Sequence, residues 1–145
     1  MKNLKICLVD DDIEDREIFQ EAFDELGSEN VLIMFNNGLE VLDYLNQTEQ
    51  IPDIIFLDLN MPIMCGLETL RRIRMKDCWK SLSIAIYSTS SAEKDIEETL
   101  IEGANIYITK PTNFESLKNA IDRVMRINWQ YHASELSHDT FLLVV

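Results

Sequence analysis

Short apolar runs alternate along the chain with longer stretches in which apolar side chains recur every three or four positions. Short runs rich in Ile, Val, Leu and aromatic residues are typical of strands that are buried on both faces of a parallel sheet. The sequence therefore predicts strands at residues 4–9, 31–35, 54–57, 82–87 and 105–109.

Helical periodicity occupies the stretches between these runs and the stretch after the last of them. The residues that mark the five helices are Ile18, Phe19, Ala22, Phe23 and Leu26; Leu39, Val41, Leu42, Tyr44 and Leu45; Leu67, Leu70, Ile73 and Arg74; residues 92–102; and Phe114, Leu117, Ile121, Val124 and Met125. We expect the third helix to begin after Gly66, the fourth to end at Gly103 and the fifth to begin near Asn113.

Five strands that alternate with five helices predict an α/β fold. We expect a flavodoxin-like (βα)5 arrangement, a doubly wound parallel sheet of strand order 2-1-3-4-5 with helices on both faces. In this order the strands at 4–9 and 54–57 are neighbours at the topological switch point. Open α/β sheets bind ligands at this point, beyond the carboxyl ends of the strands. The residues that follow Val9 and Leu57 are therefore the first candidates for a site.

Aspartates occupy both of these positions. Asp10, Asp11 and Asp12 follow the first strand, and Asp58 follows the third. Carboxylates about 5 Å apart repel each other by about 3 kcal/mol at an effective dielectric constant near 20, so a cation must compensate for such a cluster. Oxygen ligands favour a hard divalent ion, and Mg²⁺ suits an open site because it binds through one or two carboxylates and retains waters.

Two further strands deliver a hydroxyl group and an amine to the same edge. Ser88 follows the fourth strand, and Lys110 follows the fifth. A hydroxyl, an ammonium and a metal ion around a carboxylate form a site for a transferable phosphoryl group, with Asp58 as the nucleophile of an acyl phosphate. Taken singly, Asp12 and Ser88 are more simply helix caps and Lys110 a surface charge. Their joint arrival at one sheet edge favours the site.

The chain resembles, over residues 4 to about 127, the receiver domain of two-component response regulators, and in particular its stand-alone, single-domain subfamily. The motifs that carry the resemblance are LVDDD at 8–12, LDLNMP at 57–62 with Gly66, YSTS at 87–90 and GANIYITKP at 103–111. Cys65 departs from the family, which often has an acidic or amide residue there, but that loop position is variable.

The resemblance assigns a role to each site residue. It implies that Asp58 is the phosphorylated aspartate and that Asp10, Asp11 and Asp58 hold Mg²⁺ together with the backbone carbonyl of Asn60. The remaining assignments are Ser88 as the switch hydroxyl, Tyr107 as the aromatic switch residue, and Lys110 as the lysine that pairs with the phosphoryl group and precedes a cis peptide bond to Pro111.

The resemblance also implies a function. Asp58 accepts a phosphoryl group from a phosphohistidine on a sensor histidine kinase or a histidine phosphotransfer protein. The protein is then a phosphoacceptor rather than an enzyme, apart from Mg²⁺-dependent self-phosphorylation and autodephosphorylation at Asp58. We expect no output domain after residue 145, and we therefore expect the signal to leave by protein contact through a surface formed by the fourth helix, fifth strand and fifth helix. The sequence does not identify the output protein, and a homodimer is one alternative.

Charge and cysteine content narrow the location and the partners. The 26 acidic and 13 basic residues give a net charge of −13, which repels nucleic-acid phosphates and anionic membrane surfaces. Cys7, Cys65 and Cys78 are odd in number and lack CxxC spacing, so a reducing cytoplasm fits best.

We expect a receiver domain at 1–128 and a C-terminal extension of the same domain at 129–145. The role of this extension stays open: its FLLVV end could pair as an edge strand, cover the domain's own surface, or bind a partner or second copy.

Two other functions are compatible with parts of the sequence. Asp10-x-Asp12 after a strand is similar to the nucleophile motif of phosphatases of the haloacid dehalogenase type, although the further acidic motifs and the cap of that fold are not evident. A receiver that binds partners without being phosphorylated is the second alternative, and the presence of every chemical position argues against it.

Overall fold

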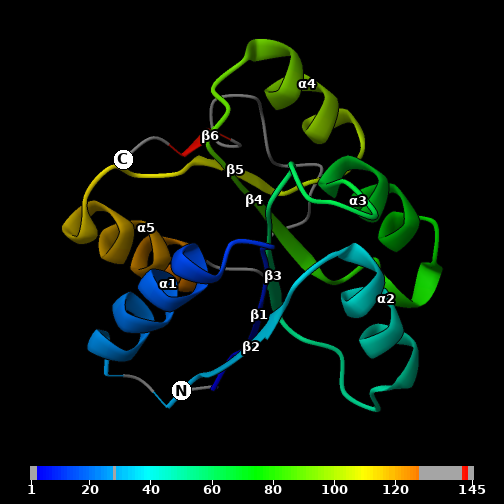
Figure 1. The fold of residues 1–145 in the computed structure, drawn as a ribbon. Helices are drawn as coiled ribbons and strands as arrows, with labels where there is room; N and C mark the ends of the chain where they lie inside the picture. The colour runs from blue at the N-terminus through cyan, green and yellow to red at the C-terminus, as the bar shows by residue number, and fades with distance from the viewer. Residues whose placement is uncertain (1–2, 28, 128–141, 144–145) are drawn as a thin grey trace.

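The computed structural model describes residues 3–27, 29–127 and 142–143 and has a parallel sheet at its centre (Figure 1). The main strands are β1 (Lys5–Val9), β2 (Val31–Phe35), β3 (Ile54–Leu57), β4 (Ser83–Ser88) and β5 (Ile106–Thr109). Their order is β2-β1-β3-β4-β5, which confirms the predicted topology. A short strand, β6 (Leu142–Leu143), pairs in parallel with the outer edge of β5.

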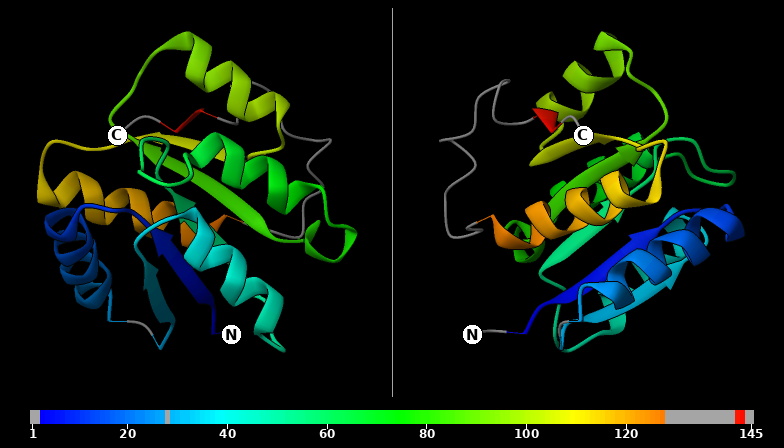
Figure 2. Two further views of the ribbon diagram at one scale, coloured as in Figure 1. Left: turned by 45° about the vertical axis from the view of Figure 1, so that its right-hand side comes forward. Right: turned by 90° about the vertical axis from the view of Figure 1, so that its left-hand side faces the viewer.

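The helices divide between the two faces of the sheet (Figures 1 and 2). They are α1 (Ile13–Glu25), α2 (Gly38–Gln47), α3 (Gly66–Arg74), α4 (Glu93–Ile101) and α5 (Phe114–Arg126), with a short 3₁₀ turn at Asp77–Trp79. One apolar core lies between the sheet and α1 and α5, and the other lies between the sheet and α2, α3 and α4. Because each strand alternates its side chains between these cores, the strands are apolar on both faces, as predicted.

Helix ends follow the capping residues in the sequence. Asp12 begins α1 by accepting a hydrogen bond from the backbone N–H of Glu14 at 2.9 Å, and Asn113 begins α5 by accepting one from Ser116 at 2.8 Å. Gly103 follows the end of α4 with φ of +102°, a conformation that glycine adopts without steric cost. No helix in the described ranges is both long enough and apolar enough to cross a bilayer.

Arg74 connects the loops that precede β4 and β5, at the edge of the sheet opposite the one that carries the aspartates. Its guanidinium donates hydrogen bonds to the carbonyls of Leu82 at 2.7 Å and Gly103 at 2.9 Å, and to Asn105 Oδ1 at 2.8 Å. No carboxylate in the described part of the chain pairs with it, and burial lowers the pKa of Arg74 to about 10. The side chain therefore supplies hydrogen-bond donors to carbonyl groups in the two loops that precede β4 and β5.

Arg74→Met is expected to lower the free energy of unfolding by about 2 to 4 kcal/mol, because it leaves several shielded acceptors without a donor. Urea denaturation measures this change. The matched control is Arg72→Met on the same helix, which removes only an exposed ion pair with Glu68 and should change the stability by less than about 1 kcal/mol. Equal losses in the two variants would contradict the role of Arg74.

Candidate functional site

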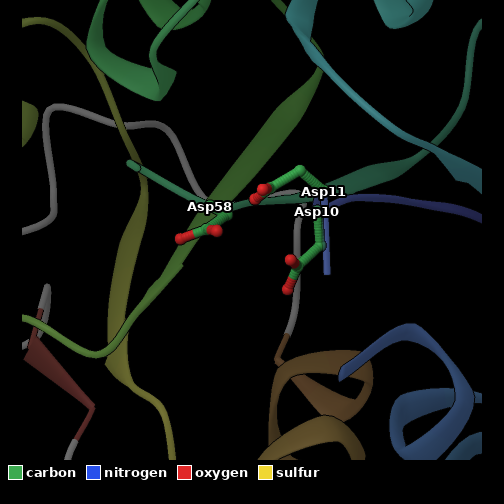
Figure 3. Close-up of side chains that lie close together, drawn as sticks. All are labelled: Asp10, Asp11 and Asp58. Atoms are coloured by element: carbon green, nitrogen blue, oxygen red, sulfur yellow. The ribbon is translucent and has the colours of Figure 1, made fainter. Parts of the chain in front are cut away.

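The topology places the predicted aspartates on adjacent strands. Val9 is paired with Leu57 in the β1–β3 register, and the backbone N–H of Asp58 donates to the carbonyl of Val9 at 3.0 Å. Asp10, Asp11 and Asp58 each offer a carboxylate oxygen, and these oxygens lie within 4.8 Å of one another (Figure 3). Residues almost fifty positions apart in the sequence thus form one acidic cluster at the predicted edge of the sheet.

Two members of this cluster are buried. Asp10 is 0% exposed and Asp58 is 6% exposed, whereas Asp11 lies at the surface. The pKa of Asp58 is raised to about 6, mainly by burial; Lys110 and the backbone N–H of Asn60 oppose the shift, and the charges of Asp10 and Asp11 add to it. Burial also raises the pKa of Asp10, against the effect of its hydrogen bonds from Asp12 and Lys110. A cation among these carboxylates would stabilise their ionised forms.

Lys110 supplies the positive charge of the site. Its Nζ atom lies 2.9 Å from Asp10 Oδ2, 2.8 Å from Asp15 Oδ2 and 3.7 Å from Asp58 Oδ2. Burial by itself would lower the pKa of Lys110, but the hydrogen bonds to Asp15 and Asp10 and the charge of Asp58 raise it above its ordinary value. The ammonium therefore remains charged throughout the physiological pH range.

The backbone fixes the position of this lysine. The N–H of Lys110 donates to the carbonyl of Ser88 at 2.7 Å, so the ends of β4 and β5 are joined next to the aspartates. No peptide bond in the described ranges is cis, so the Lys110–Pro111 bond is trans and the cis bond implied by the family resemblance is not found. Trans is the more stable form of most bonds before proline, by about 0.5–1 kcal/mol.

Ser88 and Tyr107 are buried beside the end of β4. Ser88 Oγ accepts a hydrogen bond from the N–H of Ser90 at 3.1 Å, and the hydroxyl of Tyr107 donates to the carbonyl of Ser90 at 2.8 Å. Ser90 Oγ in turn donates to Asp95 in α4 at 2.5 Å. A continuous set of contacts thus connects the predicted switch hydroxyl to the predicted switch aromatic residue and to α4.

The loop after β3 contributes Asn60 and requires Gly66. The backbone N–H of Asn60 hydrogen-bonds to the carboxylate of Asp58, and the N–H of Gly66 donates to the carbonyl of Leu59 at 2.8 Å. A Cβ atom at position 66 would lie only 2.2 Å from the carbonyl oxygen of Asp58, so only glycine allows α3 to begin against this backbone. The metal ligand predicted at Asn60 is its backbone carbonyl, and this assignment remains a prediction.

Asp15 and Tyr87 are site residues that the sequence reasoning did not identify. Asp15 lies in the first turn of α1, and the Tyr87 ring centroid lies 5.1 Å from Lys110 Nζ. The sequence does contain a signal for Asp15, because Asp12 caps the helix and the third helical residue lies near its capped end. The side chain of Asp12 serves as that cap and is not part of the three-aspartate cluster.

The donor set fits a divalent metal ion. Its three clustered carboxylates offer only oxygen, which suits Mg²⁺ or Mn²⁺ and not a thiolate-preferring metal. Lys110 contacts three carboxylates, those of Asp10, Asp15 and Asp58, and Asp11 adds a fourth carboxylate to the cluster. A divalent cation at this position would therefore find oxygen ligands and an excess of negative charge.

A doubly wound parallel sheet with an acidic pocket and a lysine at its switch point defines a class of phosphoacceptor signalling proteins. Residues 6–122 match the family model of the response regulator receiver domain, which covers most of the chain. The chain therefore belongs to the response regulator receiver domain family. The haloacid dehalogenase hypothesis is wrong, since the family is that of receivers and Asp12 is a helix cap.

Several relatives are similar to the chain over most of their length. The chemotaxis protein CheY homolog of Campylobacter jejuni is 30% identical over 122 residues, which cover 84% of this chain and 92% of that protein. The phosphorylated cyanobacterial phytochrome response regulator RcpA has a TM-score of 0.78 at 31% identity, covering 85% of this chain and 91% of its own. The Mn²⁺-bound form of the response regulator Rcp1 has a TM-score of 0.77 at 26% identity, covering 89% and 96%.

The family defines the general role of the chain. It is a phosphoacceptor in two-component signalling, and receiver domains take their phosphoryl groups from histidine kinases. Receiver domains also bind a divalent metal in an acidic pocket, which here corresponds to the cluster of Asp10, Asp11 and Asp58.

Asp11→Asn is expected to weaken binding of Mg²⁺ and Mn²⁺ at least about tenfold while stabilising the metal-free protein by about 0.5 to 1 kcal/mol, because it removes a ligand and a repulsive charge. Isothermal titration and urea denaturation in chelator measure the two effects. Asp12→Asn is the control, since asparagine also caps helices and removes the same charge. A metal-free Asp11→Asn protein that is clearly less stable than the wild type would contradict the repulsion.

The pKa of Asp58 predicts a pH dependence for the metal-free protein. Between its ordinary pKa of 3.8 and its folded value of about 6, the folded state binds the larger number of protons, so stability falls as the pH rises through this window. At pH 7.5 without metal, Asp58→Asn should therefore be more stable than the wild type by on the order of 2 kcal/mol. The difference should shrink below pH 4 and on addition of Mg²⁺. Parallel stability curves from pH 3.5 to 7.5 would overturn this assignment.

Proposed function

We propose that Asp58 accepts the phosphoryl group from a phosphohistidine, with Mg²⁺ bound by Asp10, Asp11, Asp58 and the backbone carbonyl of Asn60. The observation that carries this proposal is the convergence of the three aspartates with Lys110, whose Nζ lies 3.7 Å from Asp58 Oδ2. The relative Rcp1 has a Mn²⁺-bound form, which supports a divalent metal at such a cluster. Mg²⁺ is the specific ion we infer, because oxygen ligands at an open site suit it.

The proposed transfer uses the residues as follows. A carboxylate oxygen of Asp58 attacks phosphorus, the new O–P bond forms as the P–N bond to the donor histidine breaks, and the imidazole leaves with the bonding electron pair and takes up a proton. Mg²⁺, when bound, neutralises charge on the phosphoryl oxygens. Lys110 pairs with one phosphoryl oxygen, and the hydroxyl of Ser88 donates to another. The side chains supply position and charge, so the reaction is a single group transfer and its later hydrolysis.

The signal is proposed to leave through the surface formed by α4, β5 and α5. Movement of Ser88 toward the phosphoryl group would break its present contact with the N–H of Ser90, whose carbonyl holds Tyr107 and whose hydroxyl holds Asp95 of α4. The phosphorylation state of Asp58 is thereby coupled to the position of α4. The reader of this surface is an output protein or a second copy of the chain.

The C-terminal residues are proposed to extend the receiver domain rather than to form another one. Residues 1–128 form the receiver in this proposal, and residues 129–145 form its extension. Support comes from β6, where Leu142 and Leu143 are paired with Tyr107 and Ile108. The other predicted features of the extension lie outside the described residues. The free cysteines Cys7, Cys65 and Cys78 support a reducing cytoplasm as the location of the protein.

Asp58→Asn is expected to abolish phosphoryl uptake from acetyl phosphate or a phosphohistidine donor in Mg²⁺, because the amide is not a nucleophile at this position. Phosphate-affinity electrophoresis and intact-mass measurement detect the acyl phosphate. Asp12→Asn is the matched control and should retain most of the uptake.

Two results would overturn the proposed function. A stable, hydroxylamine-sensitive phosphate on Asp58→Asn would place the acceptor elsewhere. Failure of the wild-type chain to take up phosphate from any donor in Mg²⁺ would favour the receiver that acts without phosphorylation.

A further inference from the structure

The oxygen nearest to the Lys110 ammonium belongs to a residue for which the proposed function has no use. Lys110 Nζ lies 2.8 Å from Asp15 Oδ2 but 3.7 Å from Asp58 Oδ2. Asp15 is not one of the three clustered aspartates. The lysine that should serve the phosphoryl group is therefore held by Asp10 and by an aspartate of α1.

This contact has the features of a strong ion pair. The Lys110 side chain is 10% exposed and that of Asp15 is 35% exposed, so water screens the pair less than it screens surface pairs. The Tyr87 ring, 5.1 Å from the ammonium, adds a cation–π contact. A cavity of about 270 Å³ between α1 and the start of α5 borders Asp15, Tyr87 and Lys110, so both charged groups have space to move.

The hydrogen-bonding capacity of the ammonium makes these contacts competitive. A lysine ammonium has three N–H donors, and two of them are directed at Asp10 and Asp15. A phosphoryl group on Asp58 would bring oxygens toward the same nitrogen, and charged pairs of this kind gain most from short, direct contact. The ammonium now lies 3.7 Å from Asp58 Oδ2, so a movement that brings it into direct contact with a phosphoryl group there would draw it away from Asp15.

We propose that Asp15 is a positioning residue that holds Lys110 on the α1 side of the pocket and competes with the phosphoryl group for its ammonium. The inference rests on the proposed function and deepens it. Phosphorylation then releases the Asp15 carboxylate, so the state of Asp58 is transmitted to α1 as well as to α4. The unphosphorylated state gains an ion pair that the phosphorylated state loses, and the affinity of the pocket for a phosphoryl group is lowered by the same amount.

The test measures the affinity for beryllofluoride, a phosphoryl analogue, in saturating Mg²⁺ by fluorine NMR. Asp15→Asn is expected to bind about five- to tenfold more tightly than the wild type, because the competing carboxylate is gone. Glu14→Gln is the matched control, because Glu14 is an exposed acid in the same first turn of α1. This substitution removes the same charge and the same favourable interaction of an acid with the helix N-terminus. It should change the affinity by less than about twofold.

A second measurement assigns the effect to the lysine. In a Lys110→Met background, titrated to millimolar beryllofluoride, Asp15→Asn should improve binding no more than Glu14→Gln does. Thermal melts confirm that each variant is folded, and Asp15→Ser replaces Asp15→Asn if the latter is not.

The outcomes separate this inference from the proposed function. Wild-type protein that fails to bind beryllofluoride in Mg²⁺ would contradict the proposed function itself. Wild-type binding with Asp15→Asn equal to Glu14→Gln, or weaker than the wild type, would overturn the competition by Asp15 and leave the phosphoacceptor role intact.

Discussion

The structure depends on an excess of buried negative charge around one ammonium. Lys110 contacts Asp10, Asp15 and Asp58, and Asp11 adds a fourth carboxylate beside Asp10 and Asp58, which are almost fully buried. A single lysine cannot neutralise four carboxylates. Protonation of Asp58, whose pKa is raised to about 6, lessens the imbalance in the metal-free protein only toward acidic pH, whereas a divalent cation would lessen it without protonation. In the proposed mechanism, the same excess favours a bound divalent cation and makes that cation necessary when an anionic phosphoryl group arrives.

The strand order determines where this excess can act. The carboxyl ends of β1, β3, β4 and β5 lie side by side, so the site contacts both cores of the domain. Tyr107 belongs to the core under α2, α3 and α4, whereas Tyr87, beside Lys110, belongs to the core under α1 and α5. Ser88 and Lys110 thus begin contacts that lead to opposite faces of the sheet. A small displacement at Asp58 can reach two surfaces because the site lies at the boundary between the two cores.

The repeating pattern of the sequence was sufficient to predict the strands, their order and the clustered aspartates. Buried parallel strands have to be apolar on both faces, and this requirement is visible in runs such as residues 54–57. The pairing of Asp15 with Lys110 could not be predicted in this way, since an acidic residue is common in the first turn of any helix. The contacts of Arg74 were not visible in the sequence either, because its acceptors come from two separate loops, one before β4 and one before β5. The local pattern of apolar and polar residues predicts helices and strands. These contacts depend instead on the direction that a long side chain takes once the helices and strands have packed.

The sharing of Lys110 relates the stability of the resting protein to its response. An ion pair that exists only before phosphorylation stabilises that state and by the same free energy opposes the next one. Asp10 differs from Asp15 in this respect, because a bound cation can replace the lysine as its partner, while Asp15 lies outside the metal cluster and has no such replacement. The two aspartates contact the same nitrogen at almost equal distances, 2.9 and 2.8 Å, but in the proposed switch only the α1 contact opposes activation. In this proposal, the position of an aspartate relative to the metal, rather than its distance to the lysine, decides whether it supports or restrains the switch.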